Sequence, residues 1–224
     1  MARPIVLTIV AKPTIVGTAT IVIVPTSVLV FIPYDKPTKR KEFEMLSQKT
    51  IRANLRNVYR AANDNQIVAG TEWYFEGESF VRSLALRSGH TPEQIATVVA
   101  HLSPRQSWVR NKAMATELVT TGTTRGLGAC IARATNALNH SDPLSTLKGP
   151  KTRSFGLNLL GRYETVTVDV WAYRAACPSG NIENMGIREY REIENAYIAT
   201  AKYFGVSPAQ FQAIVWVAIR GKAE

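Results

Sequence analysis

The spacing of apolar residues along the chain predicts helices from about residue 45 onward. Between residues 48 and 62, the apolar positions Ile51, Leu55, Val58 and Ala62 recur every three or four residues. This period places the four side chains on one face of a helix, where they can pack against a core.

A longer stripe with the same period covers residues 187–204 and ends before Gly205, a residue typical of helix C-termini. The stripe consists of Ile187, Tyr190, Ile193, Tyr197, Ala201 and Phe204. The segment that follows it, residues 208–220, is apolar on nearly every side. We therefore predict a final helix at the centre of the core.

Four Ser, Thr or Asp residues stand directly before a proline, a pair typical of a helix N-cap and the first helical residue. The pairs are Thr91-Pro92, Ser103-Pro104, Asp142-Pro143 and Ser207-Pro208. Gln94 follows Thr91 by three residues, which indicates a capping box. The sequence of this region has no hairpin turn signals, and its strand-like stretch, residues 165–168, is short. The predicted fold class is mostly α, a multi-helix bundle.

Residues 1–44 differ from the rest and are predicted to be an N-terminal extension of a helical domain at residues 45–224. Residues 1–33 are rich in β-branched Ile, Val and Thr, and residues 14–32 form an uncharged run of 19. That length suits a membrane span, but the run contains four threonines and a proline. Three hypotheses stay open for this extension: a strand-forming or loose arm, a translated leader before a start near Met45, and a membrane anchor in which residues 14–32 contact the membrane.

The basic residues are concentrated in one part of the chain. The 224 residues carry a formal net charge of +10, and residues 101–174 alone hold ten Lys or Arg against four Asp or Glu. Such a concentration favours a surface that faces a polyanion, although a solvated basic face has the same composition. With 46% hydrophobic residues, the chain is not predicted to be disordered.

The cysteines and histidines are too few for a cysteine-rich zinc module or an iron–sulfur cluster. The chain has two cysteines, Cys130 and Cys177, and three histidines, none at metal-ligand spacing. We therefore predict no metal and no cofactor. Two unspaced cysteines also suit a reduced, cytoplasmic location.

The most informative segment is a helix–turn–helix pattern around Gly149. Asp142-Pro143 begins a short helix, Gly149-Pro150 ends it, and a second helix begins near Lys151. The free N–H groups at that helix start suit a phosphate, and Lys148, Lys151 and Arg153 add positive charge. Further along, a β-branched stretch leads to Asp169 at the start of another helix, where the helix dipole stabilises a carboxylate.

These residues resemble the signature of the helix-hairpin-helix (HhH-GPD) DNA glycosylase superfamily, and most of all its endonuclease III-like branch. That signature has a hairpin ending in Lys-Thr and a later Val-Asp pair that opens a helix with an Arg near its first turn. Here Lys151-Thr152 and Val168-Asp169 stand 18 residues apart, and Arg174 falls at the position of that Arg. A second match, upstream, is Leu102-Ser103, then Gln106, then Asn111-Lys112-Ala113.

The resemblance implies a DNA glycosylase fold that acts on double-stranded DNA with an extruded base. It assigns Asp169 to stabilising the positive charge that develops on the sugar as the N-glycosidic bond breaks. It assigns Lys151 to a Schiff base with the sugar C1′ in an enzyme that also cleaves the strand. Extruding the base costs a few kcal/mol, which pocket contacts offset. Gln106, Trp108 and Trp171 are the candidates for wedging or stacking.

The resemblance also suggests which basic and polar side chains contact DNA. Besides Gln106 and Trp108, the candidate DNA-binding residues are Arg105, Asn111, Lys112, Lys148, Gly149, Arg153 and Arg174. The two predicted catalytic residues also have ordinary structural explanations. Aspartate is a favoured N-cap residue, which would explain Asp169, and Lys151 has the alternative of being an ordinary solvated lysine.

The sequence departs from the family at the hairpin and at the C-terminus. Leu147 stands where the first hairpin glycine is expected, and Pro150 removes a backbone donor. The four-cysteine cluster motif of the endonuclease III branch is absent from the sequence. Two alternatives follow: a phage-type enzyme acting on hypermodified pyrimidines in DNA, and a non-catalytic module that binds DNA through the hairpin.

Overall fold

The computed structural model describes residues 46–180, 182 and 185–221, and these residues are mostly helical. The elements are α1 (Gln48–Ala61), α2 (Asp64–Ser88), α3 (Pro92–Leu102), α4 (Trp108–Thr121), α5 (Gly128–Leu138), the 3₁₀ helix η1 (Pro143–Thr146), α6 (Pro150–Asn158), α7 (Val170–Ala176), α8 (Ile187–Phe204) and α9 (Pro208–Arg220). Residues 165–168 pair with no strand in the described part of the chain. The predicted α class is confirmed.

The chain divides into two units, Met1–Phe43 and Glu44–Glu224. The β-branched extension, with its 14–32 run, lies outside the described residues, so the three hypotheses for it stay predictions. Among the helices that the structure describes, none has the length and apolar character needed to cross a membrane.

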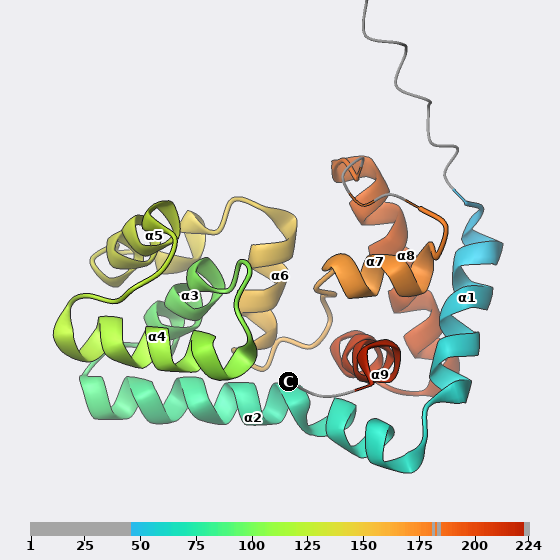
Figure 1. Ribbon diagram of the computed structural model, residues 1–224, viewed down its shortest axis with the longest axis horizontal. Helices are drawn as coiled ribbons and strands as arrows, with labels where there is room; N and C mark the ends of the chain where they lie inside the picture. Colours follow the sequence, from blue (N-terminus) through green and yellow to red (C-terminus); the bar gives the residue numbers. More distant parts are fainter. Residues whose placement is uncertain (1–45, 181, 183–184, 222–224) are drawn as a thin grey trace, which may run out of the picture. The chain divides into compact units, whose positions relative to one another are not determined.

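Two groups of buried side chains form the core of the helical unit. The first joins α2, α3, α4, α5 and α6, and the second joins α1, α7, α8 and α9. In Figure 1, α3 to α6 lie along one end of α2, while α1, α7, α8 and α9 lie toward its other end. Helix α9 belongs to both groups, because Ala209 and Ala213 face the first and Phe211 and Val215 face the second.

Helices α2 and α9 pack against each other at a glycine. A Cβ atom built on Gly70 would lie 2.4 Å from the Cα of Ile214 and 2.6 Å from its backbone nitrogen. No side chain fits into that space, so glycine permits the two backbones to approach closely. Ile214 itself is 1% exposed, which puts this contact in the interior of the unit.

Most predicted helix ends are confirmed. Thr91 and Ser207 both cap their helices with the complete capping box, and Gly205 ends α8 with a left-handed φ of 70°. Asp142 caps η1 through a hydrogen bond from the Ser145 amide. The stripe of α8 is buried at Tyr190, Ile193, Tyr197 and Ala201, but Ile187 at its start is 73% exposed.

The helix start predicted at Ser103-Pro104 is wrong. Ser103 is instead the C-cap of α3, and its hydroxyl donates to the Ala100 carbonyl within that helix. The chain then turns through Arg105, which has a positive φ of 61°, and α4 begins only after Ser107. Ser107 is the N-cap, since its side chain accepts from the Arg110 amide.

Candidate functional site

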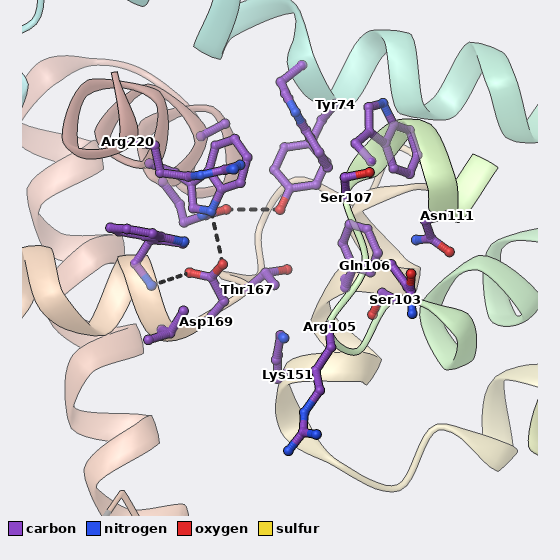
Figure 2. A pocket seen from close by; sticks show the side chains of 18 residues that line it. Tyr74, Ser103, Arg105, Gln106, Ser107, Asn111, Lys151, Thr167, Asp169 and Arg220 are labelled. Atoms are coloured by element: carbon purple, nitrogen blue, oxygen red, sulfur yellow. Dashed lines mark hydrogen bonds between the residues drawn. The ribbon is translucent and has the colours of Figure 1, made fainter. Parts of the chain in front are cut away.

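A pocket of about 290 Å³ lies where the two core groups meet. One wall is built by α7 and α9, and the other by α2, the turn at residues 103–107, α4 and α6. In Figure 2, Asp169 and Arg220 lie on one side, Gln106 and Ser107 lie on the other, and Lys151 points from α6 into the space between them. The volume is at the small end of the range for ligand sites in proteins.

All four tryptophans of the chain line this pocket: Trp73, Trp108, Trp171 and Trp216. Trp73 is the centre of the aromatic group, with ring centroids 5.1 Å from Trp108 and 5.9 Å from Trp216. Phe155, 6.1 Å from Trp73, completes it. Aromatic side chains in such numbers give a pocket the flat apolar surfaces on which planar rings stack.

Asp169 is the N-cap of α7, and three N–H groups hold its carboxylate. Oδ1 accepts from the backbone amides of Trp171 at 3.0 Å and Ala172 at 2.8 Å. Oδ2 accepts from the indole N–H of Trp216 at 2.9 Å, drawn as a dashed line in Figure 2. The side chain is half-buried and lines the pocket, so the carboxylate is fixed in direction and still accessible.

Helix α9 faces the pocket with three side chains at a spacing of four residues. Gln212 is buried, Trp216 holds Asp169, and Arg220 lies at the outer end. The guanidinium of Arg220 lies 4.2 Å from the ring centroid of Trp216 and 5.9 Å from that of Trp171. These contacts between a cation and aromatic rings keep a positive charge close to the pocket.

The 103–107 turn contributes the opposite wall. Arg105 and Gln106 both line the pocket, and the Gln106 amide donates to the Ser103 carbonyl at 3.2 Å. A positive φ is uncommon for a residue with a side chain, and here it occurs at Arg105, next to the predicted Gln106. Strained backbone of this kind concentrates at functional sites.

Lys151 lies in the first turn of α6, directly after the hairpin. Gly149 is the N-cap and contributes no side-chain cap, and Pro150 is the first helical residue. Leu147, which is 2% exposed, anchors the turn by packing against Gly156 of α6. A Cβ atom built on Gly156 would lie 2.7 Å from Cδ1 of Leu147. The exposed Lys151 lines the pocket on a well-anchored helix start.

The predicted site residues fall into two sets. Those that line the pocket are Asp169, Lys151, Arg105, Gln106, Trp108, Asn111 and Trp171. The predicted residues that do not line it are Lys112, Lys148, Gly149, Arg153 and Arg174.

Three of the side chains outside the pocket have local partners. Lys112 lies 5.2 Å from the ring centroid of Trp108, and Arg174 lies 4.8 Å from that of Trp171, so each covers the back of a pocket residue. Arg153 donates to the Leu144 carbonyl of η1 at 3.3 Å. Lys148 and Gly149 are exposed on the hairpin.

Asn111 lies in the wall and not on the surface, with 2% of its area exposed. Its Nδ2 donates to the Val99 carbonyl at 3.2 Å, which ties α4 to α3. Its Oδ1 is buried and has no hydrogen-bond partner in the described part of the chain. An unpaired buried acceptor of this kind costs free energy.

Sequence reasoning missed the pocket residues Trp73, Tyr74, Thr167, Gln212 and Arg220. Two of them had a sequence signal: Gln212 and Arg220 stand four residues to either side of Trp216 in a helix that is otherwise apolar after the capping residue Gln210. A polar stripe at helical spacing on such a helix indicates a cavity on that side. Trp216 belongs to the same stripe.

The charges around the pocket are mainly positive. Arg105, Lys151 and Arg220 line it, and Asp169 is its acidic residue. The described residues contain no group of three or more His, Cys, Asp or Glu side chains that could hold a metal ion. The three cationic side chains can therefore bind an anionic ligand at the rim of the pocket, while the Asp169 carboxylate lies inside the pocket.

Comparison with known proteins gives a family match. The model of a family described as "Family of unknown function (DUF7178)" matches residues 38–223. The chain belongs to this family. No curated protein and no solved structure matches the DUF7178 chain. The matched region of this DUF7178 member includes every residue of the pocket.

Proposed function

We propose that this chain is a DNA glycosylase of the helix-hairpin-helix type, which removes a damaged or modified base from double-stranded DNA. The observation that carries the proposal is the convergence of two sequence segments on one pocket. Gln106, Lys151 and Asp169 were singled out by their resemblance to glycosylase motifs, and all three line the same aromatic cavity. Gln106 and Lys151 are 45 positions apart in the sequence, and Lys151 and Asp169 are 18 positions apart.

The pocket's chemistry agrees with cleavage of an N-glycosidic bond. As the bond between C1′ and the base breaks, its electron pair leaves with the base and positive charge develops on the sugar. A carboxylate fixed by three N–H donors stabilises that charge without having to reorganise. Aromatic rings on several sides provide stacking for a base that has left the helix.

Lys151 supplies the nucleophile in this proposal. Its amine attacks C1′ as the bond to the base breaks, and the proton that the nitrogen loses balances the proton that the departing base takes up. The sugar ring then opens, with O4′ taking up a proton, to give an iminium between Lys151 and C1′, and loss of a proton from C2′ expels the 3′ phosphate. Arg105 and Arg220 line the pocket, and in this proposal their guanidinium groups contact the phosphates of the DNA backbone.

The decisive experiment combines base release with covalent trapping. Duplexes that each carry one damaged or modified base are incubated with the protein, and the released bases are identified by mass spectrometry. Abasic DNA with borohydride then tests for the iminium, which is reduced to a stable adduct. Lys151→Ala should remove the adduct, whereas Lys148→Ala, an exposed lysine of the same hairpin outside the pocket, should keep it.

Two results would contradict parts of the proposal. If no base is released from any duplex while the protein binds DNA, the chain is a binding module and not a glycosylase. If bases are released but no adduct forms with abasic DNA, the enzyme is monofunctional and the role of Lys151 falls.

A further inference from the structure

Gln212 is a buried polar side chain at the inner end of the pocket. Only 4% of its area is exposed, and it lines the cavity from α9. Its Oε1 accepts a hydrogen bond of 2.9 Å from the hydroxyl of Tyr74 on α2. Its Nε2 group makes no hydrogen bond to any described residue, which leaves two N–H donors for a ligand.

The Tyr74 bond determines which end of the carboxamide faces the cavity. Tyr74 is 3% exposed, and burial raises the pKa of its hydroxyl well above the usual range. The hydroxyl therefore stays protonated and donates a hydrogen bond to Oε1 of Gln212. Since the oxygen of Gln212 is engaged by Tyr74, the free group that meets a ligand is the N–H₂ group, a donor.

A donor at the inner end of an aromatic pocket selects for an acceptor on the ligand. We infer that Gln212 recognises a carbonyl oxygen on the edge of a flat heterocycle, so that the pocket prefers keto bases such as uracil and thymine over amino bases such as cytosine. This inference rests on the proposed function, in which the pocket receives an extruded base. The edge of the base farthest from the sugar enters first, and there uracil carries a carbonyl where cytosine carries an amino group.

The expected preference follows from the cost of an unmatched donor. A carbonyl oxygen accepts from Nε2, whereas an amino group would set two donors against each other in a site where Gln212 is 96% covered. Sites built to hydrogen-bond a ligand strongly reject analogues that cannot do so. We expect a keto-over-amino preference of about tenfold, at the modest end for a single hydrogen bond.

The experiment is a titration of tryptophan fluorescence, which reports this pocket because all four tryptophans line it. The full chain is titrated with deoxyuridine and, separately, with deoxycytidine. Gln212→Leu and Tyr74→Phe should each reduce the preference to about twofold or less, the first by removing the donor and the second by freeing the carboxamide to rotate. Gln212→Glu should reverse the preference, because its carboxylate accepts.

The matched control is Tyr163→Phe, which removes the hydroxyl that donates to Glu78 and does not touch the pocket. It should keep the preference of the unaltered chain. Circular dichroism verifies that each variant folds, and Tyr74→Phe carries the test if Gln212→Leu does not. Equal affinity for both nucleosides, an unchanged preference in Gln212→Leu, or no binding of either overturns the inference.

The base-release assay separates this inference from the proposed function. Release of bases with equal rates for uracil and cytosine would refute the role of Gln212 and leave the glycosylase proposal standing. A nucleoside preference that depends on Gln212, without release of any base, would refute the glycosylase proposal and support the recognition of a keto heterocycle.

Discussion

The indole N–H of Trp216 donates a 2.9 Å hydrogen bond to Oδ2 of Asp169, across 47 positions of sequence. It joins the last described helix to the start of α7, and it is the third N–H that the Asp169 carboxylate accepts. The two backbone donors belong to the first turn of the helix that Asp169 caps, whereas the indole is a separate donor from α9. The carboxylate is thereby held in one direction, toward the pocket, by both elements of one wall.

Trp216→Phe should therefore slow base release while the fold is kept. Phenylalanine preserves most of the aromatic packing but leaves Oδ2 without its indole donor. A hydrogen bond to a charged group contributes about 1.5–3 kcal/mol, which corresponds to a loss in rate of about tenfold or more if the carboxylate moves. Single-turnover rates and melting temperatures of the two proteins test this. An unchanged rate would mean that the indole bond has no part in positioning Asp169.

Asp169→Asn should abolish base release with a small effect on stability. Asparagine caps helices about as well as aspartate, so the free energy of unfolding should fall by no more than about 2 kcal/mol. Loss of the negative charge should lower the rate by about a hundredfold or more. Asp142→Asn is the matched control, because Asp142 caps η1 and does not line the pocket. Loss of folding in Asp169→Asn alone would mark Asp169 as purely structural.

Gly70→Ala should destabilise the helical unit. The added Cβ would lie 2.4 Å from a backbone atom of Ile214, so α2 and α9 must move apart. Overpacking of this kind costs about 1–3 kcal/mol, which exceeds the gain of about 1 kcal/mol from replacing a helical glycine. Gly128→Ala, also in a helix but with no atom within 4 Å of the built Cβ, should be neutral or stabilising. Urea denaturation of both variants measures the difference.

His101 should make stability depend on pH. Burial, with a smaller contribution from Arg133, lowers the pKa of the His101 imidazole, which is hydrogen-bonded to the Thr146 hydroxyl at 2.9 Å. The unfolded chain therefore binds a proton more readily than the folded one. The contribution of His101 is fully present above the unfolded pKa of about 6.5 and is lost as the pH falls through the lower folded value.

The measurement is the melting temperature between pH 7.5 and 5 for the unaltered chain and for His101→Gln. The fall on acidification should be smaller in His101→Gln, which has no proton to bind. His90→Gln, a change at a histidine for which the structure gives no hydrogen bond, should follow the unaltered chain. Parallel curves for the unaltered chain and His101→Gln would contradict the prediction.

Much of the helical framework could be predicted because its signals are local. The apolar period of α8, the capping boxes at Thr91 and Ser207, and the left-handed Gly205 depend on residues within a few positions of one another. Helix α2 was missed because two positions of its buried stripe are glycines, Gly70 and Gly77, which give no apolar signal. Apolar residues on its exposed side, such as Phe75 and Leu86, obscure the stripe further. Helix α5 was missed because Leu127 gives it no side-chain cap.

The candidate site divides in the same way. Lys151, Gln106 and Asp169 could be found because each belongs to a short pattern of neighbours. Tyr74 could not, since its role depends on the packing of α2 against α9, and the only sequence signal of Gln212 is its four-residue spacing from Trp216. The Ser103-Pro104 error has a similar cause: whether a serine ends one helix or begins the next depends on the turn through Arg105.

The position of the pocket between helices of both core groups has a consequence for finding its ligand. Its walls exist as a pair only while both groups are folded, so a compound bound between them is lost when either one melts. A bound ligand therefore raises the free energy of unfolding of the helical unit, by about 2.7 kcal/mol when the ligand concentration is a hundred times the dissociation constant. A thermal-shift screen of nucleosides and short oligonucleotides can therefore rank ligands without any assumption about the reaction.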